Sequence, residues 1–303
     1  MKKRSVFVLT VSRARLLLGA AACLFLLLGL FWHNTSAAPH QIPHVVATIN
    51  DTDDDQLRER VELLAKQYNA NPIDAKKDPV WKAIPGLNGI RVDVERTIKQ
   101  AKQAGAGSDK IPLAVDQLPP NVSLDQLGAL PIYRGNPEKK QIALMINVAW
   151  GTEFLPDMLD TLDKYHAHAT FFLDGDWAMQ NKKLAREIVK RGHEIGSHGY
   201  KHPDMSKLGK KAQINQINRT NSMIKQAAGV DANLFAPPGG AYNGTTVEVA
   251  HSFKMRTILW TLDTLDWRKP PAATITDKVL QKAGNGTLVL MHPTAPTREA
   301  LRT

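Results

Sequence analysis

The sequence predicts an α/β protein whose main domain is built on parallel strands, and three features from Gln141 onward indicate this fold class. Short apolar runs recur, they are apolar on both faces as covered parallel strands are, and the segments between them have helical spacing. The runs are IALMINV, ATFFL, HEIGS, LFAP, TILWTL and TLVLM. After the first run, LPDMLDTLDKY places four apolar residues on one helical face: Leu155, Met158, Leu159 and Leu162. This alternation is typical of a parallel barrel or a doubly wound sheet.

The first 38 residues are predicted to be a targeting segment. Five basic residues and no acidic ones accompany an apolar run from Leu16 to Trp32. Such a run fits a secretory signal peptide, cleaved after the small residues at 35–38, or an uncleaved N-terminal membrane anchor. Both alternatives place the remainder outside the cell, in the wall or at the outer face of the cytoplasmic membrane. Cys23, the only cysteine, lies within the run, so the exported part carries no disulfide.

The charge balance excludes one class of partner. The formal net charge of the chain is +10, and it falls to +5 without the five basic residues of the first 38. A modest positive charge suits an anionic cell envelope, whereas a nucleic-acid interface would need a basic cluster interleaved with aromatic residues. The sequence therefore predicts no nucleic-acid partner, and it leaves the oligomeric state open.

Residues 39–140 are predicted to form a small N-terminal module and a connector. The segment DTDDDQLRERVELLAKQY begins with acidic residues and then places Leu57, Val61, Leu64 and Tyr68 on one helical face. A second short helix is predicted over VERTIKQAKQAG and ends at Gly105. Recurrent prolines between and after these helices indicate an extended connector.

Polar residues stand at the carboxyl ends of the predicted strands. In both candidate folds, these ends meet at one edge of the sheet, where functional groups gather. The residues are Asn147 after the first strand, His198 after the third, Asp263 and Asp266 after the fifth, and His292 after the sixth. His202 follows His198 at a spacing that can direct two imidazoles at one metal ion. The sequence therefore predicts a single site that contains a histidine pair.

Four motifs, HEIGSHGYKH, FAPPGG, LDTLDW and LVLMH, resemble those of the polysaccharide deacetylases, the NodB-type carbohydrate esterases, over residues 141–303. Several segments are similar to those of one subgroup of that family from spore-forming bacilli: INVAWG, HPDMSKL and MHPT, with VWKAIPGLNGIRVDVE upstream. The resemblance implies a distorted parallel (β/α) barrel. It also implies hydrolysis of N-acetyl groups on N-acetylglucosamine or N-acetylmuramic acid polymers of the cell wall or spore wall, with one divalent metal, usually zinc.

The same resemblance assigns roles to individual residues. His198 and His202 match the metal-binding imidazoles, and His292 matches the general acid. Asp263 or Asp266 would orient His292 and hold it protonated, because a nearby carboxylate raises an imidazole pKa. The expected substrate-binding residues are Trp150, Pro237, Pro238, Trp267 and Leu290. For Trp267, an ordinary core position is the alternative.

The chain departs from the family at the positions that matter most for catalysis. The family motif Phe-Asp-Asp-Gly corresponds to residues 146–149, so that Asn147 replaces the base and Val148 replaces the third metal ligand. An amide cannot take up a proton near neutral pH. Ala236 replaces the arginine that pairs with the base, and losing both charges together avoids a buried unpaired charge.

Two functions follow as alternatives from these departures. One is an exported deacetylase in which another group replaces the base, with a weakly held metal. The candidates for that group are Asp174, Asp176 and Glu153, for which solvated loop acids are the simpler interpretation. The other is a catalytically inactive glycan-binding or scaffold protein of the envelope. A weaker third idea gives the function to the upstream module.

The segment that follows His292 also differs from the family. PTAPTREALRT begins a helix and stops, where the family continues with a complete helix and another strand. The expectation is a C-terminally truncated barrel with an exposed edge.

Overall fold

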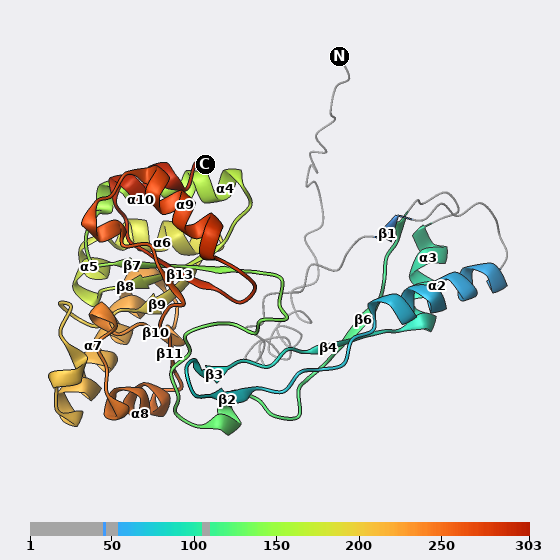
Figure 1. Cartoon of the computed structure of the whole chain (residues 1–303), viewed down its shortest axis with the longest axis horizontal. Coiled ribbons are helices and arrows are strands. Elements are labelled where there is room, and N and C mark those ends of the chain that lie inside the picture. Colours follow the sequence, from blue (N-terminus) through green and yellow to red (C-terminus); the bar gives the residue numbers. More distant parts are fainter. Residues whose placement is uncertain (1–44, 47–53, 105–109) are drawn as a thin grey trace, which may run out of the picture.

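The computed structural model describes residues 45–46, 54–104 and 110–303, and the predicted targeting segment lies outside these residues. Within the described ranges, no helix is long and apolar enough to cross a membrane. The main body is an α/β domain around a curled parallel sheet (Figure 1). This architecture confirms the predicted fold class.

The sheet has seven strands in the order β11-β10-β9-β8-β7-β13-β12, and every neighbouring pair is parallel. The strands are β7 (Ala143–Val148), β8 (Ala169–Leu173), β9 (Glu194–Ser197), β10 (Leu234–Phe235), β11 (Arg256–Thr257), β12 (Leu262–Asp263) and β13 (Leu288–Met291). The central strands β7 and β8 are buried on both faces over most of their length. This burial explains why their sequences lack the polar alternation of a half-exposed strand.

Helices cover the outer face of the curled sheet (Figure 1). They are α4 (Leu155–Lys164), α5 (Gly175–Gln180), α6 (Lys182–Lys190), α7 (Lys210–Ala228), α8 (Gly244–Ser252), α9 (Ala272–Lys282) and α10 (Ala295–Ala300). Short 3₁₀ turns join them: η1 (Asp125–Leu127), η2 (Thr152–Phe154), η3 (Met205–Lys207), η4 (Pro238–Gly240) and η5 (Asp266–Arg268). The four apolar residues predicted for one face of α4 are all buried. Ile146 and Val148 of β7 pack in the same large cluster, which lies between the sheet and its helices.

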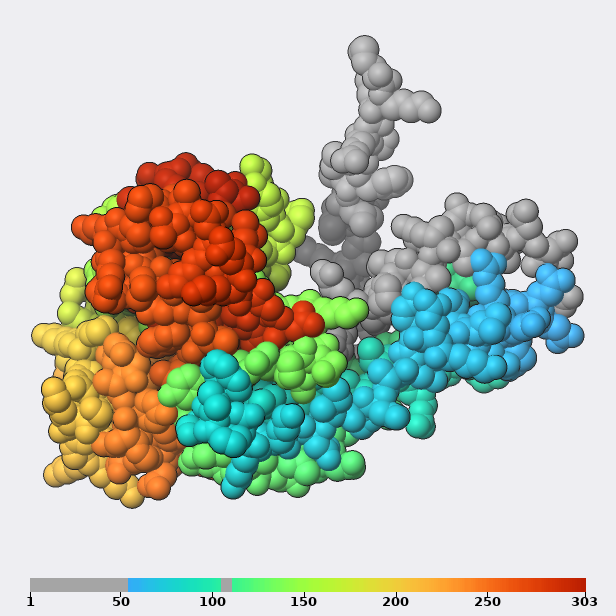
Figure 2. Space-filling view, in the orientation of Figure 1, coloured from blue at the N-terminus to red at the C-terminus, as the bar shows by residue number. Residues whose placement is uncertain are grey.

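Alternate residues of the strands face the opposite, inner side of the barrel. Met145, Phe172 and Leu290 form a second cluster there, and Ala83 and Ile132 from the N-terminal part of the chain complete it. Figure 2 shows the cyan and green segments that precede the barrel lying directly against its orange and red part. The inner face is therefore packed in part by residues from outside the repeating strand and helix pattern.

The run TILWTL, predicted as one strand, is divided between the two edges of the sheet. Its start belongs to β11, which pairs with β10, and its end belongs to β12, which pairs with β13. Residues 258–261 link the two strands, and an extended link of this length spans at most roughly 17 Å. The sheet must therefore curl until its edges approach each other. The single-strand prediction was wrong because one short segment serves both edges.

The connector fills the remaining gap between these edges. Ile132 donates its N–H to the carbonyl of Thr257 at 2.9 Å and accepts from the N–H of Leu259 at 2.8 Å. The hydroxyl of Thr261 then donates to the carbonyl of Tyr133 at 2.6 Å. Backbone groups that an open barrel would leave exposed are thus hydrogen-bonded to the connector.

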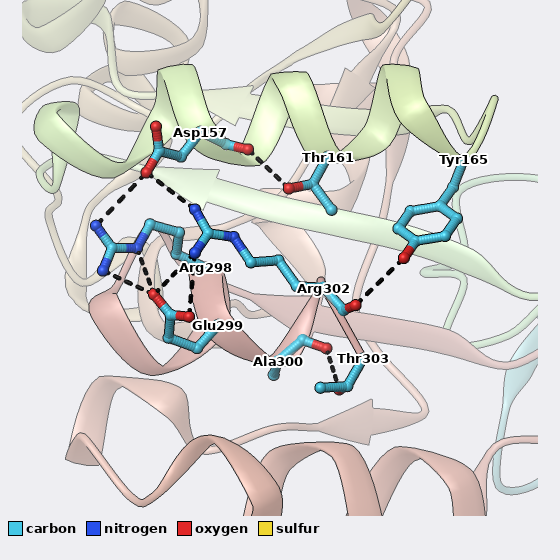
Figure 3. Close-up of polar contacts among 8 residues, drawn as sticks. All are labelled: Asp157, Thr161, Tyr165, Arg298, Glu299, Ala300, Arg302 and Thr303. Atoms are coloured by element: carbon cyan, nitrogen blue, oxygen red, sulfur yellow. Dashed lines mark hydrogen bonds and ion pairs between the residues drawn. The ribbon is translucent and has the colours of Figure 1, made fainter.

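The C-terminal helix α10 is held against α4 by an ion-pair network (Figure 3). Asp157 of α4 pairs with Arg298 at 3.6 Å and with Arg302 at 3.2 Å, and Glu299 contacts both arginines. Tyr165 adds a hydrogen bond from its hydroxyl to the carbonyl of Arg302. Because these groups are partly exposed, each pair stabilises the fold by about 1 kcal/mol or less. Their value lies in fixing the segment that follows β13.

The N-terminal module extends from the barrel as an arm with a small apolar core of its own (Figure 1). Its helices are α2 (Asp54–Tyr68) and α3 (Val94–Ala104), and Val61 and Leu64 are buried as the helical spacing predicts. Its strands pair antiparallel: β1 (Val45–Val46) with β5 (Lys110–Ile111), β2 (Lys76–Asp78) with β3 (Lys82–Ile84), and β4 (Gly89–Val92) with β6 (Val115–Leu118). These strands have two to four residues and lie among prolines, so the sequence pattern did not indicate them.

Replacing Ile132 tests whether the connector is part of the barrel. We expect Ile132→Ala to lower the free energy of unfolding by about 2–4 kcal/mol, because it leaves a cavity in the inner cluster. Val80→Ala is the matched control, since Val80 is 67% exposed and its truncation should cost about 0.5 kcal/mol or less. Urea denaturation measures both values, and equal effects would contradict the packing described above.

Candidate functional site

The register of the parallel strands lines up the residues that follow them. Met291 pairs with Ile146, Val148 with Leu173, Leu173 with Ser197, and Ser197 with Phe235. The positions at this carboxyl edge are His292 after β13, Asn147 at the end of β7, Asp174 after β8, His198 after β9 and Ala236 after β10. The structure therefore brings most of the predicted site residues to one edge, which we call the carboxyl-edge site.

His198 has the properties of a prepared metal ligand. Its Nδ1 lies 2.8 Å from the carbonyl oxygen of Ala236, so Nδ1 carries the hydrogen and Nε2 keeps a lone pair. Burial, followed by the nearby charge of His202 and a smaller effect of His292, lowers the pKa of His198 to about 3, although the hydrogen bond to Ala236 acts in the opposite direction. The ring of His202 lies 5.2 Å from that of His198, centroid to centroid. The histidine pair thus exists, with at least one ring neutral and oriented.

His292 is oriented by Asp266 and not by Asp263. Asp266 is fully buried, and it accepts from Nδ1 of His292 at 2.8 Å and from its backbone N–H at 2.5 Å. Thr297 adds a third hydrogen bond to the same carboxylate. Asp263 instead accepts from the backbone N–H of Leu265 at 2.8 Å. Of the two predicted partners, geometry selects Asp266, and Nε2 of His292 remains for a ligand.

Two exposed tryptophans are linked to the pair formed by His292 and Asp266. Trp150 stacks on the His292 ring, with centroids 5.8 Å apart and planes 5° from parallel. Trp267 directly follows Asp266, and the guanidinium of Arg268 lies 4.7 Å from the centroid of its ring. Trp150 is 45% exposed and Trp267 47%, so the alternative of an ordinary core position for Trp267 is wrong. Both rings are available to a ligand.

The other expected substrate-binding residues are less accessible. Leu290 is buried in the inner cluster of the barrel, beside Ala236. Pro237 and Pro238 are also buried, and Pro238 packs against Gly199, which follows His198. These three residues support the site from beneath.

Asn147 and Val148 stand at the two positions for which the resemblance implies carboxylates, and neither side chain can replace that chemistry. Asn147 is 4% exposed, and its side-chain oxygen has no hydrogen-bond partner. Val148 lies in the apolar cluster under the helices. A buried polar atom without a partner is uncommon and costly, so Asn147 is a position at which function or ancestry has overridden stability.

The acids considered as replacements for the base are hydrogen-bonded elsewhere or exposed. Asp174 is a buried N-cap whose carboxylate accepts from the backbone N–H groups of Asp176, Trp177 and His202. Burial raises the pKa of Asp174, although these donors act in the opposite direction. The interpretation as a solvated loop acid was therefore wrong for Asp174. Asp176 accepts from Gln180, and Glu153 is exposed.

The donor set does not fit a catalytic metal. Such sites use three protein ligands, as a rule, and leave one position for water or substrate. Across residues 54–104 and 110–303, no group of three or more His, Cys, Asp or Glu side chains could hold a metal ion. The histidine pair alone is two ligands, so no catalytic step is assigned to a metal here.

A surface groove of about 550 Å³ lies away from these residues, on the helices. It is lined mainly by α4 and α6, including Pro156, Lys183 and Arg191. None of the predicted site residues contacts it. The chemistry of the chain is concentrated at the carboxyl edge instead.

Comparisons with known proteins agree with this geometry. The chain is 44% identical to the uncharacterized protein YlxY of Bacillus subtilis, over 87% of this chain and 84% of that protein. A family model described as polysaccharide deacetylase matches residues 134–258. The chain belongs to the polysaccharide deacetylase family. The predicted resemblance is thereby confirmed, and members of this family are generally metal-dependent.

The similar proteins include one that is described as a pseudoenzyme and one that is named as a deacetylase. A protein of Bacillus anthracis, BA3943, described as a CE4 family pseudoenzyme, is 41% identical with a TM-score of 0.72, covering 81% of this chain and 87% of that one. A mutant of BA3943 is described as having restored enzymatic activity. The peptidoglycan-N-acetylglucosamine deacetylase PgdA of Listeria monocytogenes is 35% identical over 53% of this chain, which spans 34% of that protein.

Sequence reasoning missed two features of the site. Thr297 supports Asp266 from α10, and no motif indicated it, because its distance from Asp266 in the chain gives no signal. Gly151 has a φ of 74°, and a Cβ there would lie 1.9 Å from the carbonyl oxygen of Pro293. Only glycine lets the loop after β7 approach the loop after β13 this closely, and this approach places Trp150 on His292.

Gly151→Ala tests that approach. We expect it to lower the free energy of unfolding by more than about 2 kcal/mol, because the left-handed backbone and the contact with Pro293 both oppose a side chain. Gly284→Ala is the control, since nothing lies near its Cβ position and its φ is not positive. Thermal and urea denaturation measure the difference. A Gly151→Ala protein as stable as Gly284→Ala would contradict the close approach.

The zinc content of the purified protein is a second testable property of this site. With two imidazoles and no third ligand, we expect less than one zinc ion per chain to survive dialysis, by elemental analysis. His198→Ala should remove the remaining zinc. A full equivalent of zinc in the unmodified protein, abolished by His198→Ala, would show that a third ligand exists.

Proposed function

We propose that this protein is an exported, catalytically inactive member of the polysaccharide deacetylase family that binds N-acetylated glycan of the cell wall at the carboxyl-edge site. The observation that carries the proposal is Asn147, a buried asparagine whose side-chain oxygen has no hydrogen-bond partner, at the position of the base. The basic and apolar segment of residues 1–38 supports export to the envelope.

The chemistry of amide hydrolysis explains why we expect this site to be catalytically inactive. The reaction needs a polarised carbonyl, an activated water and a proton for the departing amine. An asparagine cannot accept the proton of the water, and loss of a general base lowers a rate by about 10²–10⁴. The missing third ligand removes the means of polarising the carbonyl as well.

The binding half of the site is retained. His292 is fixed by Asp266, so its Nε2 can form a hydrogen bond with an acetamido group. Trp150 and Trp267 offer apolar ring faces beside it. A sugar has both polar edges and apolar faces, which are the two features these residues match.

Ala236 shows how the fold tolerates the absence of a carboxylate at position 147. It is fully buried with Phe172 and Leu290, where a guanidinium would need a carboxylate partner. With Asn147 in place of that partner, the small apolar residue avoids an unpaired charge. We therefore expect a carboxylate at position 147 and a guanidinium at position 236 to be tolerated only when both are present.

The comparisons support both parts of the proposal. BA3943, similar over most of its length, is described as a pseudoenzyme, which favours inactivity. Relatives named as peptidoglycan deacetylases include PgdA and the N-acetylmuramic acid deacetylase PdaC of Bacillus subtilis, which favour peptidoglycan as the ligand. An active deacetylase with an altered site is the alternative, favoured by the intact hydrogen bond between His292 and Asp266.

Restoring the missing groups distinguishes these functions. We expect the unmodified protein to bind N-acetylated peptidoglycan fragments but to release no acetate, even at high protein concentration with added zinc or cobalt. Asn147→Asp with Ala236→Arg, made with and without Val148→Asp, should release acetate in at least one form. Because Val148 lies in the apolar core, Val148→Asp should destabilise the fold by several kcal/mol in the absence of metal.

Two controls complete the assay. Adding His292→Ala to the restored variant should lower its acetate release by about 10² or more, because the proton donor is removed. Acetate release by the unmodified protein, lost in His198→Ala, would overturn the proposal in favour of the active alternative. Thermal unfolding of every variant separates lost activity from lost structure.

A further inference from the structure

We propose that Tyr133, Tyr242 and Trp260 form a second sugar-binding subsite, which extends the carboxyl-edge site so that it holds an oligosaccharide and not a single sugar. This inference rests on the proposed glycan-binding function. It assigns to the connector a direct part in recognition, in addition to its part in the fold.

Three separate segments supply the subsite. Tyr133 comes from the connector, Tyr242 from the loop after η4, and Trp260 from the link between β11 and β12. All three side chains are partly exposed. Because each comes from a different segment, their convergence could not be seen in any single motif.

Specific contacts join Tyr133 to Tyr242 and join Trp260 to the turn that precedes Tyr242. The hydroxyls of Tyr133 and Tyr242 lie 2.8 Å apart and share a hydrogen bond. The ring of Trp260 packs so closely on Gly240 that a Cβ there would lie 2.6 Å from it. Gly240 has a φ of 68° and precedes Tyr242 by two residues. The loop after η4 is therefore fixed between Tyr133 and Trp260.

The subsite adjoins the histidine pair. Pro238, at the start of η4, contacts the position of Gly199, where a Cβ would meet its ring at 3.2 Å. Gly199 directly follows His198 in the chain. Because His198 and Pro238 are both buried, this contact fixes the η4 turn, and with it the loop that carries Tyr242, beside the segment that carries His198.

The chemistry of the subsite matches a pyranose ring. An aromatic face is electron-rich and attracts the C–H groups on the apolar face of a sugar. In the tyrosine pair, one hydroxyl donates to the other, which leaves one O–H and several lone pairs for sugar hydroxyls. A neighbouring ring face and a free phenol group provide both contacts that one sugar unit needs.

The two aromatic groups lie on opposite sides of the histidine pair in the strand order. Trp150 and Trp267 follow β7 and β12, whereas Tyr242 and Trp260 follow β10 and β11. His198, after β9, lies between β7 and β10 in the sheet. The subsite therefore uses strand ends that Trp150 and Trp267 do not use, so a short oligomer should bind without the new subsite and a long one should reach it.

Oligomers of N-acetylglucosamine of two lengths test the inference by calorimetric titration. We expect Tyr242→Ala to weaken binding of a pentamer about tenfold and to leave binding of a dimer unchanged, because the dimer is held by Trp150, Trp267 and His292. Tyr68→Ala is the matched control, since Tyr68 is a partly exposed tyrosine that packs on the N-terminal module's own apolar cluster, and it should bind both ligands as the unmodified protein does. Trp267→Ala should weaken both.

A second variant guards against a folding defect. Tyr133→Phe with Tyr242→Phe removes only the hydroxyls, and it should weaken the pentamer about threefold and spare the dimer. If both the Ala and Phe variants bind the pentamer as tightly as the unmodified protein, the inference is wrong while the proposed function stands. If the unmodified protein binds neither oligomer, the proposed function itself fails.

Discussion

The site depends on one constraint, which is the parallel register of five adjacent strands. Because β13, β7, β8, β9 and β10 are paired in step, the residues that follow them meet at one edge. Two imidazoles from one loop and a third from a distant one therefore approach each other without any direct bond between their segments. The outer helices and the inner cluster stabilise this register, and α10 fixes the loop that carries His292 through its contacts with α4.

Within that frame, the two halves of the site differ. His292, Asp266 and Thr297 form an intact hydrogen-bonded network. The base side has become apolar or neutral at Asn147, Val148 and Ala236. Leaving either the carboxylate or the guanidinium alone would bury an unpaired charge at a cost of several kcal/mol. Neutral residues at all three positions therefore avoid a buried unpaired charge, as the proposed loss of catalysis requires.

Much of this arrangement could be predicted from the sequence. Runs apolar on both faces indicated the parallel strands, and the resemblance of four motifs indicated the positions of His198, His202 and His292. The choice between Asp263 and Asp266 could not be made, because spacing does not reveal which carboxylate turns toward the ring. The division of TILWTL and the role of Ile132 were also beyond the sequence, since both depend on how the two sheet edges meet.

The central claim is that the carboxyl-edge site binds N-acetylated glycan without a metal and without hydrolysing it. A titration with an N-acetylglucosamine oligomer in the presence of a strong chelator, followed by mass spectrometry of the recovered ligand, tests both parts at once. We expect the oligomer to bind with the same affinity with and without chelator, and the recovered ligand to have an unchanged mass. Binding that disappears with the chelator, or a ligand that has lost acetyl groups, would contradict it.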